Sequence, residues 1–155
     1  MLGMNMLLWT AKVTPAHEAL LRDLAAIGYG SVEIPLFDAD PAQARELGRL
    51  LDLIGLARSG LAALGAEDNP ISADPAVRDL ARQNARTAVD AAGELGARML
   101  VGPFHSGFGV HSGAGPTPDE WKRSVDFVGD LADYAAPRGV SLSLEFLNRF
   151  ECYLL

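Results

Sequence analysis

Residues 28–41, Gly28-Tyr-Gly-Ser-Val-Glu-Ile-Pro-Leu-Phe-Asp-Ala-Asp-Pro41, hold a short apolar run between two kinds of turn signal. Gly28 suits the left-handed turn that ends a helix. Asp40 followed by Pro41 is typical of a helix start, because the aspartate caps a free backbone N–H and the proline has none to lose. The stretch therefore predicts the end of one helix, a strand over residues 31–36 and the start of the next helix.

The same signals recur along the chain. Three further segments open with a capping residue followed by proline, and the segments close at or near a glycine. Between these signals the apolar residues have helical spacing, and Thr117 and Glu120 also have the spacing of a capping box. The openings are Thr14, Asp40, Asp74 and Thr117, and the closing glycines are Gly28, Gly55, Gly96 and Gly139. Four helices are predicted, within residues 14–28, 40–55, 74–96 and 117–139.

Short, largely apolar segments of strand length surround these helices. Strands that are apolar on both faces are typical of a parallel sheet covered by helices. The third is the weakest, because Arg58, Ser59 and Gly60 interrupt it. The segments are residues 4–9, 31–36, 56–64, 98–104 and 140–146. Strict alternation of strand and helix predicts an α/β fold with a parallel sheet and right-handed crossovers.

Two architectures fit this alternation: an open doubly wound sheet, or part of a (β/α)8 barrel. The first strand-to-helix turn has no GxGxxG or P-loop pattern, so nucleotide binding at a Rossmann-type site is unsupported. The glycines within residues 107–115 lack the spacing of a phosphate cradle, and we expect a flexible loop there.

Composition narrows the class of protein. The 155 residues are 49% hydrophobic and 21% charged, which is typical of one globular domain. A net charge of −7 without a basic stripe does not favour nucleic acid. The sequence has no signal-peptide pattern and no apolar run of about 20 residues, so no membrane contact is expected. A single cysteine, Cys152, excludes an intrachain disulfide, and we expect a cytoplasmic protein with an inert thiol.

Ligand sites of both architectures lie beyond the carboxyl ends of the strands. Glu145 follows the apolar strand Ser141–Leu144, which should bury it, and a buried carboxylate needs a partner, a hydrogen bond or a metal. The alternative is an ion pair with Arg149. Glu33 lies between Val32 and Ile34, where a structural hydrogen bond inside the sheet is favoured.

Other side chains at these strand ends are candidates of lower specificity. His105 and His111 favour a solvent-facing or substrate-facing role over metal binding, because their spacing in a glycine-rich loop is not that of a ligand pair. Trp9, Phe104 and Phe108 either line a pocket or pack in the core.

Residues 144–151, Leu-Glu-Phe-Leu-Asn-Arg-Phe-Glu, resemble the fifth-strand motif of ketose 3-epimerases, the D-tagatose/D-psicose 3-epimerase group of the xylose isomerase-like TIM-barrel superfamily. Residues 28–34, 74–79 and 95–103 are also similar to that family. The resemblance implies that residues 1–155 are the N-terminal portion of a single barrel domain. This portion would contain strands one to five with four crossover helices and be truncated after strand five.

The resemblance also implies a chemistry. In the family, a divalent cation (Mn²⁺, Co²⁺ or Mg²⁺) binds an open-chain ketose, and two glutamates exchange the proton on C3 through an enediolate. Glu145 matches the glutamate that is both metal ligand and acid/base, and Glu151 matches one that binds the substrate. Trp9, Phe104, His105 and Phe108 fall where the family lines its substrate pocket. The remaining ligands belong to later strands, so the 155-residue chain alone is expected to be inactive.

Two other readings stay open. One is a related barrel enzyme, such as a hydroxypyruvate isomerase or an inosose dehydratase-like enzyme. The other is a non-catalytic half-barrel that self-associates, with Glu33 and His105 of one copy facing Glu145 of the other. The expected partner is a small-molecule ketose, and a homo-oligomer is left open.

Overall fold

Five parallel strands lie side by side in the order in which they occur in the sequence. The computed structural model describes residues 2–155. Its strands are β1 (Gly3–Asn5), β2 (Ser31–Pro35), β3 (Ala57–Leu61), β4 (Met99–Gly102) and β5 (Ser141–Leu144). The predicted parallel α/β fold is confirmed, and the sequential strand order distinguishes it from a doubly wound sheet, whose order reverses at a switch point.

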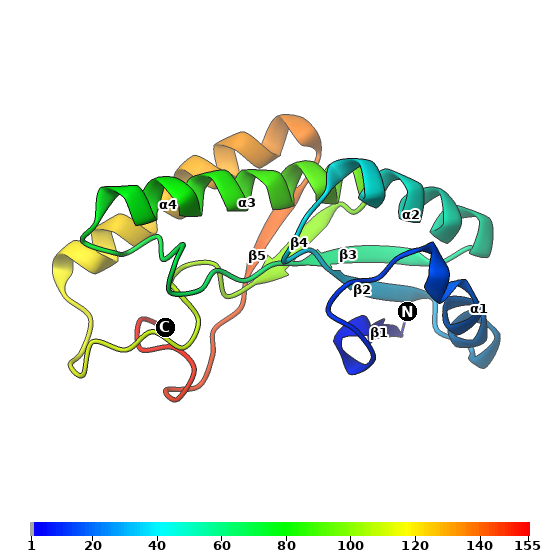
Figure 1. Ribbon diagram of the computed structural model, residues 1–155, viewed down its shortest axis with the longest axis horizontal. Helices are drawn as coiled ribbons and strands as arrows, with labels where there is room; N and C mark the ends of the chain where they lie inside the picture. The colour runs from blue at the N-terminus through cyan, green and yellow to red at the C-terminus, as the bar shows by residue number, and fades with distance from the viewer. Residues whose placement is uncertain (1) are drawn as a thin grey trace.

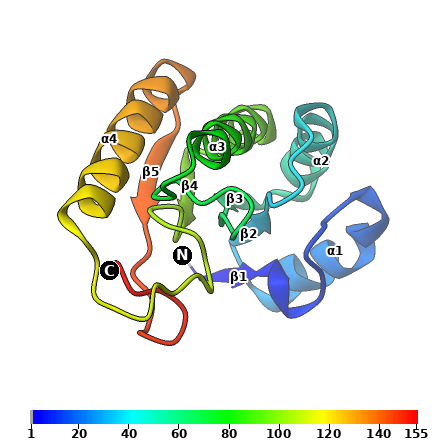
Figure 2. The ribbon, with the colours of Figure 1, turned by 60° about the vertical axis from the view of Figure 1, so that its left-hand side comes forward.

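Four helices cover one face of this sheet (Figures 1 and 2). They are α1 (Glu18–Ile27), α2 (Pro41–Ile54), α3 (Pro75–Leu95) and α4 (Pro118–Ala135), with short 3₁₀ turns at Met6–Leu8, Pro15–His17 and Ala136–Arg138. The sheet is curved with its helices on the outside, as in part of a (β/α)8 barrel (Figure 2). Among residues 2–155, none of the helices has the length and apolar character needed to cross a membrane.

The helix ends follow the capping signals in the sequence. The Asp40 carboxylate accepts hydrogen bonds from the N–H groups of Ala42 and Gln43, and Asp74 accepts one from Ala76. Thr117 and Glu120 form the predicted capping box. The first opening differs, because the proline after Thr14 begins a 3₁₀ turn and α1 starts only at Glu18.

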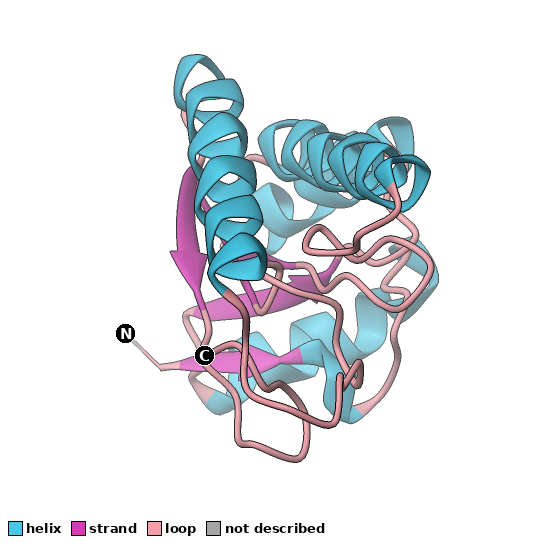
Figure 3. Cartoon of the chain, turned by 90° about the vertical axis from the view of Figure 1, so that its left-hand side faces the viewer, coloured by secondary structure: helices cyan, strands magenta, loops and turns pink. Residues whose placement is uncertain are grey.

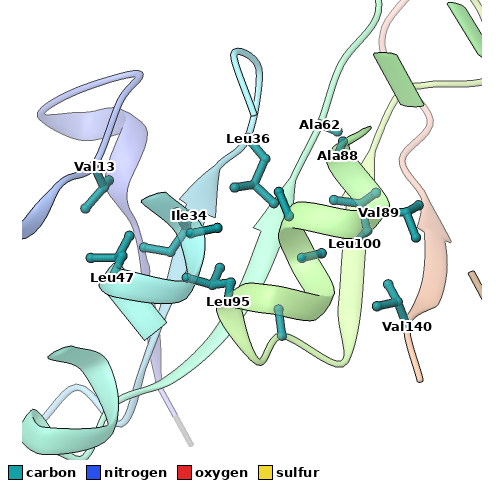
Figure 4. Packing of buried hydrophobic residues seen from close by; sticks show 14 of the residues in the cluster. Val13, Ile34, Leu36, Leu47, Ala62, Ala88, Val89, Leu95, Leu100 and Val140 are labelled. Carbon is teal, nitrogen blue, oxygen red and sulfur yellow. The ribbon is translucent and has the colours of Figure 1, made fainter. Parts of the chain in front are cut away.

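The core lies between the sheet and its helices, as Figure 4 shows. Val32 and Ile34 on β2 are each 1% exposed and face the helices, whereas Ser31 and Glu33 alternate to the other face. Leu47 of α2 and Leu95 of α3 pack against this apolar row. Burying each such side chain contributes about 1.5–3 kcal/mol.

The residues that weakened the third strand have structural roles in it. The Arg58 side chain turns toward the helices, donates from Nε to the carbonyl oxygen of Leu95 at 2.8 Å and pairs with Asp52. Gly60 lets the side chains of Leu36 and Leu100 approach the strand. The interruption therefore marks close packing against α3.

The strands are shorter than predicted at their carboxyl ends. After β1 the chain turns into the 3₁₀ helix Met6–Leu8, because the Asn5 side chain accepts a hydrogen bond from the N–H of Leu7. Strands β3, β4 and β5 likewise end at Leu61, Gly102 and Leu144. The residues that follow the strands therefore lie outside the sheet hydrogen bonding, and their side chains can line a site at the carboxyl ends of the strands.

Candidate functional site

A cavity of about 450 Å³ opens at the carboxyl ends of the strands. That size is typical of small-molecule sites. Its walls come from the segments that follow β1, β2, β3, β4 and β5. The lining residues are Leu7, Phe37, Leu61, Ala63, Leu64, Gly65, Pro103, Phe108, Glu145 and Leu147. Within the described part of the chain, Glu145 is the one charged residue of this lining.

Glu145 is positioned by the continuation of β5. Its backbone N–H donates to the carbonyl oxygen of Gly102 at 3.0 Å, which extends the β4–β5 pairing by one hydrogen bond. The alternation of the strand places Glu145 on the same face as Ser143, away from the helices. The carboxylate thus lines the cavity from the rim of the last strand.

The Glu145 side chain is exposed, so the expectation that its strand buries it is wrong. The physical reason is that no described helix covers the face to which it points (Figure 2). Over residues 2–155 its carboxylate makes no ion pair, and the alternative pairing with Arg149 is not found. A carboxylate without a protein partner at a cavity rim is available to a ligand.

Glu33 is instead held within the sheet. Its Oε1 accepts a hydrogen bond from Nδ2 of Asn5 at 2.9 Å, and its Oε2 accepts one from the Ser59 hydroxyl at 3.2 Å. Asn5, Glu33 and Ser59 are register partners on β1, β2 and β3. The structural role favoured by the sequence is confirmed.

Two of the predicted substrate-binding residues lie in the interior. Phe104 is 1% exposed and belongs to the main core. His105 is fully buried, and its Nε2 lies 3.2 Å from the carbonyl oxygen of Glu145. Burial lowers the pKa of His105, and the hydrogen bond to Glu145 opposes part of that shift. The neutral imidazole is therefore favoured.

Of the two exposed aromatic residues predicted to bind substrate, Phe108 lines the cavity and Trp9 does not. Phe108 is 48% exposed and lines the cavity. Trp9 is also 48% exposed, but it follows the 3₁₀ turn Met6–Leu8 and is not part of the lining. The substrate contacts assigned to these residues stay predictions.

Glu151 lies in the segment after β5, which is red in Figure 2 and lies beside the yellow-green loop after β4. Both belong to the loops near the C-terminus in Figure 3. The backbone carbonyl of Glu151 accepts a hydrogen bond from the N–H of Gly109 at 2.9 Å, and its carboxylate accepts one from the side-chain amide of Asn148. Nε2 of His111 donates to the carbonyl oxygen of Phe150 at 3.2 Å. Glu151 lies outside the cavity lining, so its substrate role also stays a prediction.

The same segment is anchored to α4 by a tyrosine. The Tyr153 hydroxyl donates to Oε1 of Glu120 at 2.6 Å. Burial, with the hydrogen bond to Glu120, raises the pKa of Tyr153 to about 12. The backbone N–H of Thr117, and then Tyr153, lower the pKa of Glu120.

Two apolar walls of the cavity, Leu7 and Leu147, were not among the predicted site residues. Leu7 leaves the ladder in the turn after β1, and Leu147 follows β5. The available signal was positional: large apolar residues just beyond a strand's carboxyl end either pack or line a site.

The described residues do not make a metal centre by themselves. Nowhere in residues 2–155 do three or more His, Cys, Asp or Glu side chains gather as potential ligands. Glu145 offers oxygen atoms of the kind that Mn²⁺ and Mg²⁺ prefer, but such sites take several ligands. The residues present therefore do not fit a complete cation site.

A second hollow, of about 480 Å³, lies among the helices and is lined by Pro41, Asp90, Gly93, Glu94 and Arg138. Its charges are already paired, because Glu94 bonds to Arg45 and Asp90 bonds to Arg138, each at 2.6 Å. The open carboxylate of Glu145 makes the strand-end cavity the stronger candidate site.

Comparison with known proteins gives 3-epimerases as relatives. The chain is 28% identical to an L-ribulose 3-epimerase of Mesorhizobium japonicum, over 99% of this chain and 52% of that protein. It is 32% identical to a ketose 3-epimerase of Arthrobacter globiformis, over 83% of this chain and 44% of that protein. The chain spans about half the length of the curated relatives it matches.

Solved structures of 3-epimerases are also similar to this chain. A D-allulose 3-epimerase from Methylomonas sp. superposes with a TM-score of 0.88 at 28% identity, over 98% of this chain and 53% of that one. The family model described as "Xylose isomerase-like TIM barrel" matches residues 21–155. By that match, together with its curved, sequentially ordered parallel sheet, the chain belongs to the xylose isomerase-like TIM-barrel family.

Proposed function

We propose that this chain provides the fifth-strand glutamate and much of the pocket wall of a metal-dependent ketose 3-epimerase. One observation carries the proposal. The unpaired carboxylate of Glu145 lines a cavity of sugar size at the carboxyl ends of the strands. The similarity to L-ribulose and ketose 3-epimerases supports the reaction class.

The proposed chemistry is proton exchange next to a carbonyl group. Glu145 takes the proton from C3 of an open-chain ketose, and the C–H electron pair moves into a C2–C3 double bond to give an enediolate. A proton returned to the opposite face of C3 gives the epimer, with the atoms balanced and no oxidant or reductant needed. A carboxylate in this role contributes about 10²- to 10⁴-fold to the rate.

The second half of the exchange needs a second acid. Glu145 approaches C3 from one side, and no other charged residue among residues 2–155 lines the cavity. We propose that residues 1–155 are the N-terminal portion of one barrel domain, and that the rest of the barrel carries the acid for the opposite face.

The proposal includes a divalent cation, Mn²⁺, Co²⁺ or Mg²⁺, with Glu145 as one ligand. When bound, such a cation neutralises negative charge that develops on the substrate oxygens. The described residues alone offer too few ligands to hold it, so the others would come from the rest of the barrel. The single cysteine supports a reducing, cytoplasmic location.

The test uses the natural gene product that contains residues 1–155, purified with Mn²⁺. We expect it to interconvert a ketose and its C3 epimer, such as D-fructose and D-psicose, and to incorporate deuterium at C3 from deuterated water. Glu145→Gln should lower kcat about 10²- to 10⁴-fold. Glu67→Gln is the matched control, because Glu67 is exposed after β3 and lies outside the cavity lining.

Two results would overturn the proposal: no C3 exchange with any ketose tested, or unchanged kcat in Glu145→Gln. The separately expressed 155-residue chain should show no turnover. Turnover by that chain alone would contradict the assignment of the second acid to the rest of the barrel.

A further inference from the structure

A chain of three buried polar side chains lies directly behind Glu145. Cys152, Ser106 and His105 are 2%, 1% and 0% exposed, respectively. Sγ of Cys152 is 2.9 Å from Oγ of Ser106, which is 3.1 Å from Nδ1 of His105. Nε2 of His105 is 3.2 Å from the carbonyl oxygen of Glu145. The chain ends on the backbone of the residue that carries the candidate acid/base group.

The hydrogen bonds of this chain run in one direction when the ring is neutral. A carbonyl oxygen only accepts, so Nε2 of His105 carries the ring proton and donates it to Glu145. Nδ1 then has a lone pair and accepts from the Ser106 hydroxyl. The Ser106 oxygen in turn accepts from the thiol of Cys152. Each of the three side chains thus has a partner. The Glu145 carbonyl fixes the ring proton on Nε2, and the bare Nδ1 faces the Ser106 hydroxyl and, at 4.0 Å, the Cys152 thiol.

The chain connects segments that are distant in the sequence. His105 and Ser106 belong to the loop after β4, and Cys152 belongs to the segment after β5. The Ser124 hydroxyl of α4 donates to the carbonyl oxygen of His105 at 2.8 Å, which holds the histidine from its other side. Cys152 also packs with Ile71 and Leu154 in a small apolar cluster. The ring of His105 therefore has one orientation.

Among residues 2–155, both backbone groups of Glu145 have hydrogen-bond partners, whereas its side chain has none. Its N–H donates to Gly102 on β4, and its carbonyl oxygen accepts from His105. Without the hydrogen bond from His105, the backbone of Glu145 would keep one hydrogen bond among the described residues, from its own N–H to Gly102, just beyond the end of β5. Acid/base chemistry needs its reacting group held within about 0.5 Å of the productive position.

We propose that His105 is a positioning residue for Glu145, and that Ser106 and Cys152 fix the ring of His105 so that its Nε2–H faces the Glu145 carbonyl. The kinetic part of this inference rests on the proposed function of Glu145. The structural part, one ring orientation with the proton on Nε2, does not depend on any activity.

The structural part is tested by nitrogen NMR of the histidine rings in the natural gene product. We expect the wild-type His105 ring to be protonated at Nε2 and unprotonated at Nδ1. Cys152→Ser keeps a donor to Ser106 and should preserve that pattern, whereas Ser106→Ala removes the hydroxyl that donates to Nδ1 and should shift the Nδ1 signal while Nε2 stays protonated. A wild-type ring protonated at Nδ1, with Nε2 bare, would overturn the proposal.

The kinetic part is tested by paired variants of His105. His105→Leu removes the donor to Glu145 and should lower kcat about 10- to 100-fold with little change in KM. His105→Gln can place an amide N–H near the same carbonyl and should recover most of kcat. His17→Leu, at the remote start of α1, is the matched control. A merely structural role would lower the melting temperature of both His105 variants and leave the kcat of the folded protein unchanged.

Failure of this inference can be told apart from failure of the proposed function. If Glu145→Gln retains full kcat, the proposed function fails, and the NMR result still decides the tautomer. If Glu145→Gln is inactive but His105→Leu keeps wild-type kcat, only the positioning role fails.

Discussion

Nδ2 of Asn5 on β1 donates to Oε1 of Glu33 on β2 at 2.9 Å, and the two residues are direct register partners in the sheet. Glu33→Ala leaves Asn5 and Ser59 without this partner and should lower the free energy of unfolding by about 1–3 kcal/mol. Glu33→Gln can still bond to both and should cost less than about 1 kcal/mol. Urea unfolding measures both, and equal losses in the two variants would argue against the structural role.

Gly102 should not tolerate a side chain. Its φ is +148°, and an added Cβ would lie 1.8 Å from the carbonyl oxygen of Ala62 on the neighbouring strand segment. Gly102→Ala should therefore lower the free energy of unfolding by at least about 3 kcal/mol. Gly129→Ala is the control, because Gly129 is exposed within α4 with open space around it, and it should stabilise the protein by about 0.5–1 kcal/mol. Urea unfolding of the two variants gives the contrast, and a tolerated Gly102→Ala would show that β3 and β4 can separate.

Phe104 and Phe108 should separate stability from ligand binding. Phe104→Ala opens a hole in the main core and should cost about 3–5 kcal/mol of unfolding free energy. Phe108→Ala removes an exposed cavity wall, so it should cost less than about 1 kcal/mol and raise the KM for the ketose. Chemical unfolding and steady-state kinetics on the natural gene product measure the two effects. An unchanged KM in Phe108→Ala would remove this side chain from the substrate contacts.

The Tyr153–Glu120 hydrogen bond should make stability depend on pH at both extremes. The folded pKa of Tyr153, about 12, exceeds the ordinary tyrosine value of about 10, so its contribution is complete below pH 10 and is lost as the pH rises toward 12. The folded pKa of Glu120 is below the ordinary glutamate value, so its contribution is complete above that ordinary value and is lost as the pH falls through the folded pKa.

Tyr153→Phe should therefore cost about 1 kcal/mol near neutral pH, and the difference from wild type should shrink at both ends of the scale. Urea unfolding at a series of pH values measures it. Tyr29→Phe is the control, because Tyr29 makes no side-chain hydrogen bond with the described residues. A loss that stays constant from pH 3 to pH 12 would contradict the linkage to ionisation.

The helix positions could be predicted because their signals are local. An aspartate before a proline, as at Asp40 and Asp74, satisfies backbone N–H groups two or three residues away, and this needs no knowledge of the rest of the fold. Strand ends could not be predicted so well, because a strand ends where its partner strand stops offering hydrogen bonds, and the partner is distant in the sequence. At Asn5 a side-chain bond to Leu7 replaces the expected continuation of the strand.

The position of Glu145 in the fold could be predicted from the sequence, but the surroundings of its side chain could not. The motif at residues 144–151 puts Glu145 at the rim of the last strand, which is where the structure has it. Its exposure depends on what covers the helix-free face, which local sequence does not reveal. The inward turn of His105 depends on a carbonyl group 40 residues away, so no local pattern indicates it.

The sequential order of the sheet has a consequence for how the chain is made. Within residues 2–155 each strand pairs with its neighbours in the sequence, so a newly synthesised strand-helix unit can dock on the edge of the unit made just before it. Among β1 to β5 the order of synthesis then matches the order of pairing, and in a closed barrel only the outer edge of β1 would wait for a late strand. Growth by successive edges leaves two edges unpaired at every stage, the outer edge of β1 and that of the newest strand, and each can pair with another chain until it is covered.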